Sequence, residues 1–352
     1  MHPVRSRAPP MSRASRELWS AVPGLDVVVD RAGFTDHARR VNFGEETWTR
    51  ARLLACGMTD NQIRRAVARG VLSTVRPGVD VARSVLEGSS ADVKHLHSVR
   101  AASVSAGVVS HQSAALVHGF SLWEPDLTLV HVTVDRATGG RITTRRHVHV
   151  GPLPADDVVS VDGLQVTSAA RTIADLSRTL DFEAAVCVGD SALNSGSTTI
   201  DAIRACLDSA PTRGGTSARR VVDFLDPRSE SIGESRSRVM LRALGMPAPE
   251  LQISVLDPAG RLIGRPDFLF DRQGVIGEFD GFVKYSSLVP KGSSPSRVAF
   301  AEKRREDEFR SYGWMVVRWV WSELATPDVV GRRLRRAFDI AATMPTPCTG
   351  RR

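Results

Sequence analysis

The sequence predicts a mixed α/β chain made of three consecutive folded parts. Its 352 residues exceed what one ordinary hydrophobic core needs. Helical and strand-like hydrophobic periods alternate along the chain, and Gly and Pro divide them into groups. The parts are a helix-turn-helix with a β-ribbon, a central α/β domain, and a C-terminal domain of element order αβββαβ. We expect a basic, partly disordered lead-in at 1–45, the three domains at 46–85, 86–225 and 226–340, and a tail at 341–352.

The N-terminal lead-in contains Met1 and a second possible start at Met11. It lacks the apolar core of a secretory signal, and the chain has no apolar run of membrane-spanning length. The four cysteines form no CxxC pair, which is typical of reduced thiols. We therefore expect a cytoplasmic protein with no membrane partner. The oligomeric state is left open.

The charge of the chain indicates a polyanionic partner. The formal net charge is +8, and residues 1–85 hold 14 Arg and no Lys against eight acidic residues. Arginine suits bidentate contacts with phosphate, and nucleic acid is the commonest polyanion. Double-stranded DNA is the expected partner, although a high-GC genome also enriches Arg.

The first folded part is predicted to be a winged helix-turn-helix. Thr49 can cap a first helix that ends at Gly57, and Thr59 can cap a second helix that stops at Gly70. Residues 71–82 then alternate like a two-stranded ribbon with a Pro-Gly turn. In this arrangement the second helix lies in the major groove of DNA.

Arginines on the second helix and the ribbon are the candidate DNA contacts. Arg64, Arg65 and Arg69 fall largely opposite the apolar residues of the helix, and Arg76 lies in the ribbon. The alternative is a solvated arginine face with no ligand. The ribbon directly after the helix favours DNA binding.

The central part predicts a helix over 98–119, strands over 127–136 and 145–153, and a helix pair over 167–196. His147 and His149 are two apart on the second strand, so both rings share a face that zinc could use. No third ligand stands at a recognisable spacing. We therefore interpret the pair as an exposed polar strand face and assign no metal.

The C-terminal part brings acidic residues to the ends of neighbouring strands. Asp267 accompanies one predicted strand, and Glu278 and Asp280 share a face of the next. Converging carboxylates repel one another, and a divalent cation relieves the repulsion. Oxygen ligands of this kind select Mg²⁺ or Mn²⁺, which can activate water for phosphodiester hydrolysis. The predicted elements are a helix over 233–244, strands over 250–257, 261–270 and 275–281, a helix over 299–313, and a strand over 314–321 that is apolar enough to be central.

Three further residues complete the predicted catalytic set. Glu234 lies in the first turn of the helix, and Lys284 or Lys303 could supply a cation for the developing charge. Taken singly, each acid has an ordinary explanation, such as a turn cap, the solvent face of a strand, or a helix N-terminus. An arginine already paired with these acids would leave only nucleic-acid binding.

Residues 229–322 resemble the PD-(D/E)XK nuclease superfamily, in its branch similar to very-short-patch-repair endonucleases. The matching stretches are Glu234, Pro266-Asp267, EFDG, EKRREDEFRSYGW and VVRWVW. The resemblance implies a restriction-endonuclease-like domain with Asp267 and Glu278 as metal ligands and Glu234 as an auxiliary ligand. Asp280 stands where the superfamily has lysine, and Lys284 fits the displaced lysine of some branches.

Residues 46–210 resemble type IV abortive-infection antitoxins, which join a winged helix to an α/β domain. The likeness is carried by TRARLLACGMTDNQIRRAVARGVLSTVRPGV, SHQSAALVHGF and GLQVTSAARTIADL in that order. It implies promoter binding, autoregulation and a cognate toxin. The favoured expectation is metal-dependent hydrolysis of DNA in a defence or toxin–antitoxin setting. The alternative is a non-catalytic transcriptional repressor or antitoxin.

Overall fold

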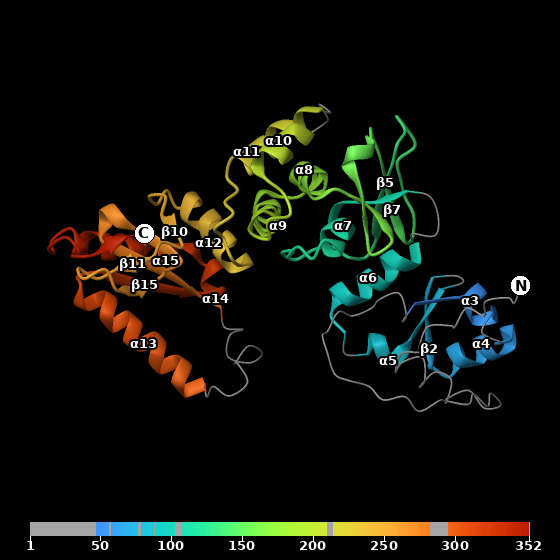
Figure 1. Cartoon of the computed structure of the whole chain (residues 1–352), viewed down its shortest axis with the longest axis horizontal. Helices are drawn as coiled ribbons and strands as arrows, with labels where there is room; N and C mark the ends of the chain where they lie inside the picture. Colours follow the sequence, from blue (N-terminus) through green and yellow to red (C-terminus); the bar gives the residue numbers. More distant parts are fainter. Residues whose placement is uncertain are drawn as a thin grey trace, which may run out of the picture. The chain divides into compact units, whose positions relative to one another are not determined.

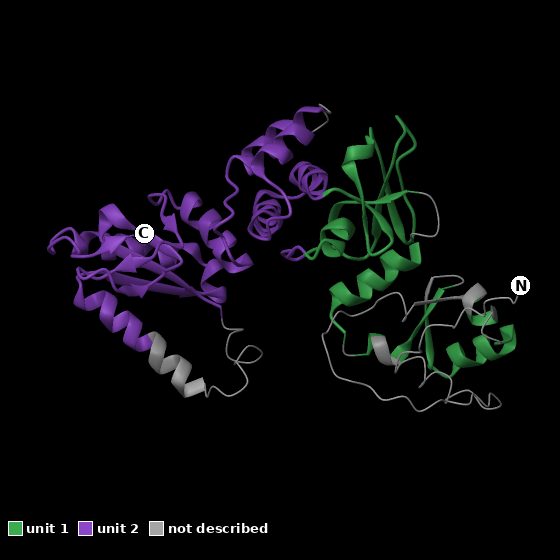
Figure 2. Cartoon of the chain, in the orientation of Figure 1, with its two compact units in different colours: residues 1–119, 125–168 green, residues 120–124, 169–352 purple. Residues whose placement is uncertain are grey.

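The computed structural model describes residues 47–55, 58–76, 79–87, 89–102, 107–209, 214–281 and 295–351. The chain divides into two compact units (Figure 2), one of residues 1–119 with 125–168 and the other of 120–124 with 169–352. The predicted boundary at residue 225 falls inside the second unit, and the lead-in lies outside the described residues. Among the helices of the described residues, none combines the length and the apolar character needed to cross a bilayer.

The first unit begins with a small three-stranded sheet and two short helices (Figure 1). Thr59 caps the second helix as predicted, since its hydroxyl accepts from the Gln62 N–H while the Gln62 side chain accepts from the Thr59 N–H. The ribbon is present, and a further strand that the sequence did not predict pairs with it, giving the order β1-β3-β2. The elements are β1 Thr47–Thr49, α3 Arg50–Ala55, α4 Asp60–Ala68, β2 Leu72–Arg76, β3 Val79–Ala82, α5 Arg83–Leu86 and α6 Ala91–Ala102.

A mixed six-stranded sheet forms the rest of the first unit, in the order β6-β7-β5-β4-β9-β8. Strand β5 runs parallel to β7, and β4 runs parallel to β9. Valines on one face of this sheet pack with α6 into a core. The elements are β4 Val108–Val109, α7 His111–Val117, β5 Val130–Val134, β6 Arg141–Ile142, β7 Arg146–Val150, β8 Val158–Val161 and β9 Leu164–Thr167.

The single helix predicted over 98–119 is wrong. Helix α6 ends at Ala102, and α7 starts at His111 after the short strand β4. Gly107 has a φ of 137°, which an L-residue seldom adopts, and the β-branched pair Val108–Val109 joins the sheet instead. The β-branched pair Val108–Val109 therefore forms a strand between two helices.

The second unit opens with a group of helices. Helices α8 and α9 confirm the predicted helix pair, and Asp181 caps the second of them. Asp190 on α9 is buried, and its carboxylate accepts from Arg238 Nη1 at 2.6 Å and Ser235 Oγ at 2.8 Å, which joins α9 to α12. The elements are α8 Ala169–Thr179, α9 Phe182–Asn194, α10 Ile200–Ser209, α11 Gly215–Val222 and α12 Ile232–Ala243.

The C-terminal part of the second unit holds a four-stranded sheet in the order β10-β13-β14-β15. The predicted strand over 250–257 is broken at Gln252, whose φ is 55°, and its second half joins a separate sheet of order β12-β11-β16. The predicted tail contributes β16. The elements are β10 Glu250–Leu251, β11 Val255–Leu256, β12 Leu262–Gly264, β13 Phe268–Phe270, β14 Val275–Asp280, α13 Pro295–Ser311, β15 Met315–Val320, α14 Trp321–Leu324, α15 Pro327–Ala341 and β16 Gly350–Arg351.

Strand β15 is an edge strand of its sheet, so the prediction of a central position is wrong. It is apolar because both faces of the sheet are covered. Val317 and Trp319 pack with Leu334 of α15, whereas Val316 packs with Phe309 of α13 on the other face. Burial on two faces gives a continuous apolar run wherever the strand stands in the sheet.

Candidate nucleic-acid interface and acidic pocket

Helix α4 exposes a basic face. Ile63 and Ala66 are buried against Leu53 and Leu72, so the opposite side of the helix is directed to solvent. Arg64 and Arg65 are exposed on α4, and Arg69 is exposed just after it. Within the described part of the chain, Arg65 and Arg69 make no ion pair.

Asn61 extends this face, and the sequence analysis did not single it out. Asn61, Arg64, Arg65 and Ala68 are all exposed at helical spacing i, i+3, i+4 and i+7. Asn61 Oδ1 accepts from the Arg64 guanidinium at 2.5 Å. Arginine and asparagine are the side chains that contact phosphates and base edges in the major groove. The side chain of Arg76 and the turn at 77–78 lie outside the described residues.

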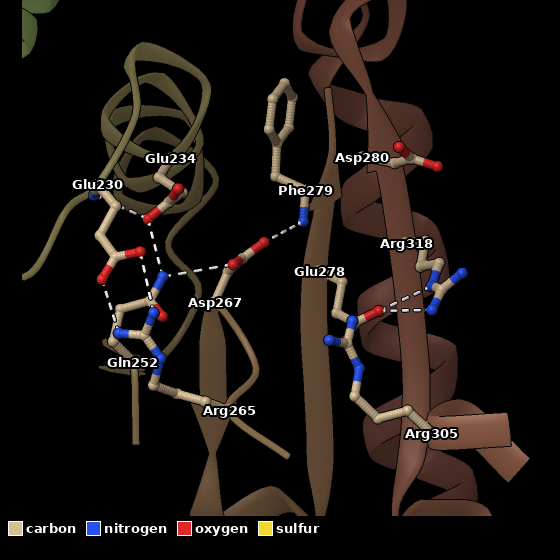
Figure 3. Close-up of a pocket in the computed structure, with 10 residues that line it drawn as sticks. All are labelled: Glu230, Glu234, Gln252, Arg265, Asp267, Glu278, Phe279, Asp280, Arg305 and Arg318. Atoms are coloured by element: carbon tan, nitrogen blue, oxygen red, sulfur yellow. Dashed lines mark hydrogen bonds and ion pairs between the residues drawn. The ribbon is translucent and has the colours of Figure 1, made fainter. Parts of the chain in front are cut away.

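The predicted acidic residues of the second unit line one pocket (Figure 3). Glu234 comes from α12, Asp267 precedes β13, and Glu278 and Asp280 belong to β14. Gly233 allows α12 to approach the sheet, because a Cβ at this position would lie 1.9 Å from the Phe279 ring. This close packing carries Glu234 to the edge of the pocket.

Two of the acids share one amide donor. Gln252 Nε2 donates to Glu234 Oε2 at 3.0 Å and to Asp267 Oδ1 at 3.3 Å. Asp267 Oδ2 also accepts the backbone N–H of Phe279 at 2.9 Å. Gln252 is held in the left-handed region, a conformation that persists where surrounding contacts fix it. The break in the predicted strand therefore places this bridging amide.

Glu278 is neutralised by two arginines. Its side chain is 9% exposed, Oε1 accepts from Arg305 at 3.1 Å, and Oε2 lies 2.7 Å from Arg318 Nη2. Glu278 and Arg318 are register partners on the parallel strands β14 and β15. Arg305 reaches the pocket across Gly264, where a Cβ would lie 2.8 Å from the Arg305 side chain. Figure 3 shows Glu278 directed toward Arg318 rather than toward Asp267.

One of the two predicted cations can be placed, and it lies outside the pocket. Lys303 is exposed on α13 and does not line it, and Lys284 lies outside the described residues. The pocket contains Arg265, Arg305 and Arg318 instead, and Arg265 pairs with Glu230 at 2.6 Å. Sequence reasoning missed these arginines. The sequence feature that could have revealed them is Arg318, a charged residue inside the otherwise apolar run VVRWV.

The expected ligand set for Mg²⁺ or Mn²⁺ does not converge on one point. Among the described residues, one set of three His, Cys, Asp or Glu side chains places its ligand atoms within 4.8 Å of one another, and that set contains no acid. Asp267, Glu278 and Asp280 line the same pocket, but Asp267 is hydrogen-bonded to Gln252 and the Phe279 N–H, whereas Glu278 is ion-paired with two arginines. A metal at these acids stays a prediction.

The converging set is made of histidines in the first unit. His147 and His149 are half-buried, so the prediction of an exposed polar strand face is wrong. His131 Nδ1 lies 2.9 Å from His149 Nε2, and the His111 ring stacks on that of His149 with centroids 3.7 Å apart. Burial, with the nearby histidines, lowers the pKa of His131 to about 4 and that of His149 to about 3. Both are neutral imidazoles at pH 7.

One family comparison covers the centre of the chain. Residues 105–224 match the family model of the AbiEi antitoxin C-terminal domain. The antitoxin-like part of the sequence prediction is thereby confirmed for these residues. The region from 229 to 322, with its nuclease resemblance, lies outside the match.

The chain is also similar to two curated proteins of Mycobacterium tuberculosis. It is 27% identical over 183 residues to the uncharacterized protein MT2308 of strain CDC 1551 / Oshkosh and, equally, to the uncharacterized protein Rv2248 of strain ATCC 25618 / H37Rv. The alignment covers 51% of this chain and 64% of each relative, so the chain spans less than two thirds of the length of these proteins.

Proposed function

We propose that the chain is a DNA-binding antitoxin that represses transcription and acts with a cognate toxin. The observation that carries this proposal is the AbiEi antitoxin match at 105–224, which follows a helix pair with an exposed arginine face. Arg64, Arg65 and Arg69 contact phosphates or base edges from a helix docked in the major groove. The net charge of +8 adds a sequence-independent attraction to DNA.

Helix α4 is suited to this role by its support as well as by its charge. Its buried residues fix the helix on the small sheet, and its capping box fixes the first turn. The arginines therefore project from a rigid element. A rigid element loses less conformational entropy on binding than a loop does.

A reporter gene behind the promoter upstream of the protein's own gene tests the proposal. The wild-type chain is expected to repress the reporter, and Arg64→Ala/Arg65→Ala is expected to relieve repression at equal protein level. Arg220→Ala is the matched control, because Arg220 is exposed in α11 and lies outside the proposed interface. A reporter that wild-type protein leaves unchanged contradicts the proposal.

The second candidate is Mg²⁺- or Mn²⁺-dependent hydrolysis of DNA in the acidic pocket. One observation favours it: Glu234, Asp267, Glu278 and Asp280 line a single pocket. The ion pairs of Glu278 with Arg305 and Arg318 favour the antitoxin function, because a metal ion bound to Glu278 must displace two arginines.

Plasmid cleavage separates the two candidates. Purified chain is incubated with supercoiled plasmid and Mg²⁺ or Mn²⁺, beside Asp267→Ala and Glu278→Ala variants. Intact plasmid in all samples is the result expected of an antitoxin alone. Cleavage by wild-type protein that both variants abolish establishes hydrolysis and assigns the acids to it.

A further inference from the structure

The polar face of the six-stranded sheet gathers four side chains that can bind or orient a ligand. Val130, Val132 and Val148 point to the core, so alternate residues of β5 and β7 point to the other face. His131 and His147 are register partners there, and so are Thr133 and His149.

A further histidine reaches this face from the N-terminus of α7. The His111 ring stacks on His149 with an interplanar angle of 15°, and its Nδ1 lies 3.0 Å from Ser110 Oγ. The backbone of His111 has a φ of 52°, in the left-handed region that non-glycine residues rarely adopt. Strain of this kind clusters at ligand sites, where surrounding groups fix the conformation. A histidine ring that only packs against its neighbours would not require this strained backbone.

The spacing of the three imidazoles suits one metal ion. Ligand nitrogens of His111, His131 and His149 lie within 4.8 Å of one another, and His131 Nδ1 and His149 Nε2 are 2.9 Å apart. Imidazole nitrogens bound at about 2.0–2.1 Å to a tetrahedral zinc ion are roughly 3.4 Å apart. A hydrogen bond accounts for the pair His131 and His149. It does not account for the left-handed backbone of His111.

A buried hydroxyl beside the rings is a second, independent observation. Thr133 is 2% exposed, and its Oγ1 has no hydrogen-bond partner among the described residues. By register Thr133 is the neighbour of His149 on the same face. Buried hydroxyls are nearly always paired, so this atom indicates a partner that the described residues do not supply. A water bound to a metal would supply that partner.

We propose that His111, His131 and His149 form a binding site for Zn²⁺ or another divalent transition metal that prefers imidazole. Nitrogen ligands exclude Mg²⁺ and Ca²⁺ as the natural occupants, since those ions select oxygen. Three histidines leave the fourth position to water, the arrangement of an open zinc site. The ligands come from α7, β5 and β7, so the ion ties the helix to the sheet. The site is independent of the proposed interface on α4.

Cobalt is the probe for this site, because tetrahedral Co²⁺ absorbs visible light whereas Zn²⁺ does not. The full chain, free of any affinity tag and treated with EDTA, is titrated with CoCl₂. We expect a visible band that saturates at one equivalent per chain and disappears on addition of one equivalent of Zn²⁺. His149→Ala and His131→Ala are each expected to lose the band.

His118→Gln is the matched control and should retain the stoichiometric band. His118 is a half-buried histidine of the same unit whose Nε2 lies 2.8 Å from the Thr167 carbonyl oxygen, outside the cluster. Far-UV circular dichroism checks that each variant is folded. A wild-type chain that takes up no Co²⁺ overturns the proposal without reference to any variant. A stoichiometric band that survives His149→Ala overturns the ligand assignment.

Discussion

Removing two arginines from α4 should change the salt dependence of DNA binding by a predictable amount. Arg64 and Arg65 are exposed on the face of the helix opposite Ile63 and Ala66, so their replacement by Ala leaves the core unchanged. Each phosphate that a protein neutralises releases counterions and adds about −0.9 to the slope of log affinity against log salt. Losing both contacts should therefore make the slope shallower by about 1.8.

This slope converts into a measurable ratio of affinities. Raising the salt concentration fourfold, from about 50 to about 200 mM, should weaken wild-type binding about 12-fold more than binding by the double variant. DNA contacts elsewhere on the chain contribute equally to the salt slopes of both proteins, so they cancel in the comparison. Ala also has a higher helix propensity than Arg, so loss of helix cannot explain a weaker complex.

Fluorescence anisotropy with a labelled duplex at four or five salt concentrations gives the slopes. Arg220→Ala should retain the wild-type slope within about 0.3. Equal slopes for wild-type and double-variant protein would refute the assignment of α4 as the DNA-contacting helix, even if both bind tightly.

Three further predictions concern stability. Thr59→Ala removes the capping box of α4 and should lower the free energy of unfolding of the first unit by about 1 kcal/mol, measured by urea titration. An unchanged urea midpoint would contradict a stabilising role for this cap. Arg318→Ala leaves the buried Glu278 carboxylate with one partner and should cost on the order of 2 kcal/mol, less than a fully broken buried pair; a cost near zero would show that the pair contributes nothing. In metal-free protein, stability should be full above about pH 6.5 and fall toward pH 4, because the pKa values of His131 and His149 lie below that of an unfolded His. His149→Gln should flatten that decline, and an identical pH profile would contradict the depressed pKa.

Local signals in the sequence were sufficient for much of the first unit. The Thr59 cap, the apolar spacing of α4 and the two strands of the ribbon are each encoded within a few residues. The third strand, β1, was missed because three residues at Thr47–Thr49 carry no alternation long enough to recognise. Its pairing with β3 is a tertiary contact.

The acidic pocket shows where reasoning from the sequence stops. The identity of the acids and their strands could be predicted from spacing. The neutralisation of Glu278 could not, because Arg305 and Arg318 lie 27 and 40 residues away along the chain. Strand register alone brings Arg318 opposite Glu278. Predicting this ion pair from the sequence would have required the assumption that β14 and β15 pair in parallel.

The histidine cluster was hidden for the same reason. His147 and His149 form a visible pair, whereas His131 and His111 come from other elements. A helix predicted through residue 111 placed that histidine on an ordinary helical face. Its true position depends on the left-handed backbone at the start of α7. No local pattern encodes that contact.

Chemical protection of guanine N7 in the promoter duplex tests the central claim most directly, because N7 is exposed only in the major groove. We expect wild-type protein to shield particular guanines from dimethyl sulfate, and Arg64→Ala/Arg65→Ala to leave the same guanines reactive. Protection that the double variant retains, or tight binding that leaves every guanine N7 reactive, would contradict the docking of α4 in the major groove.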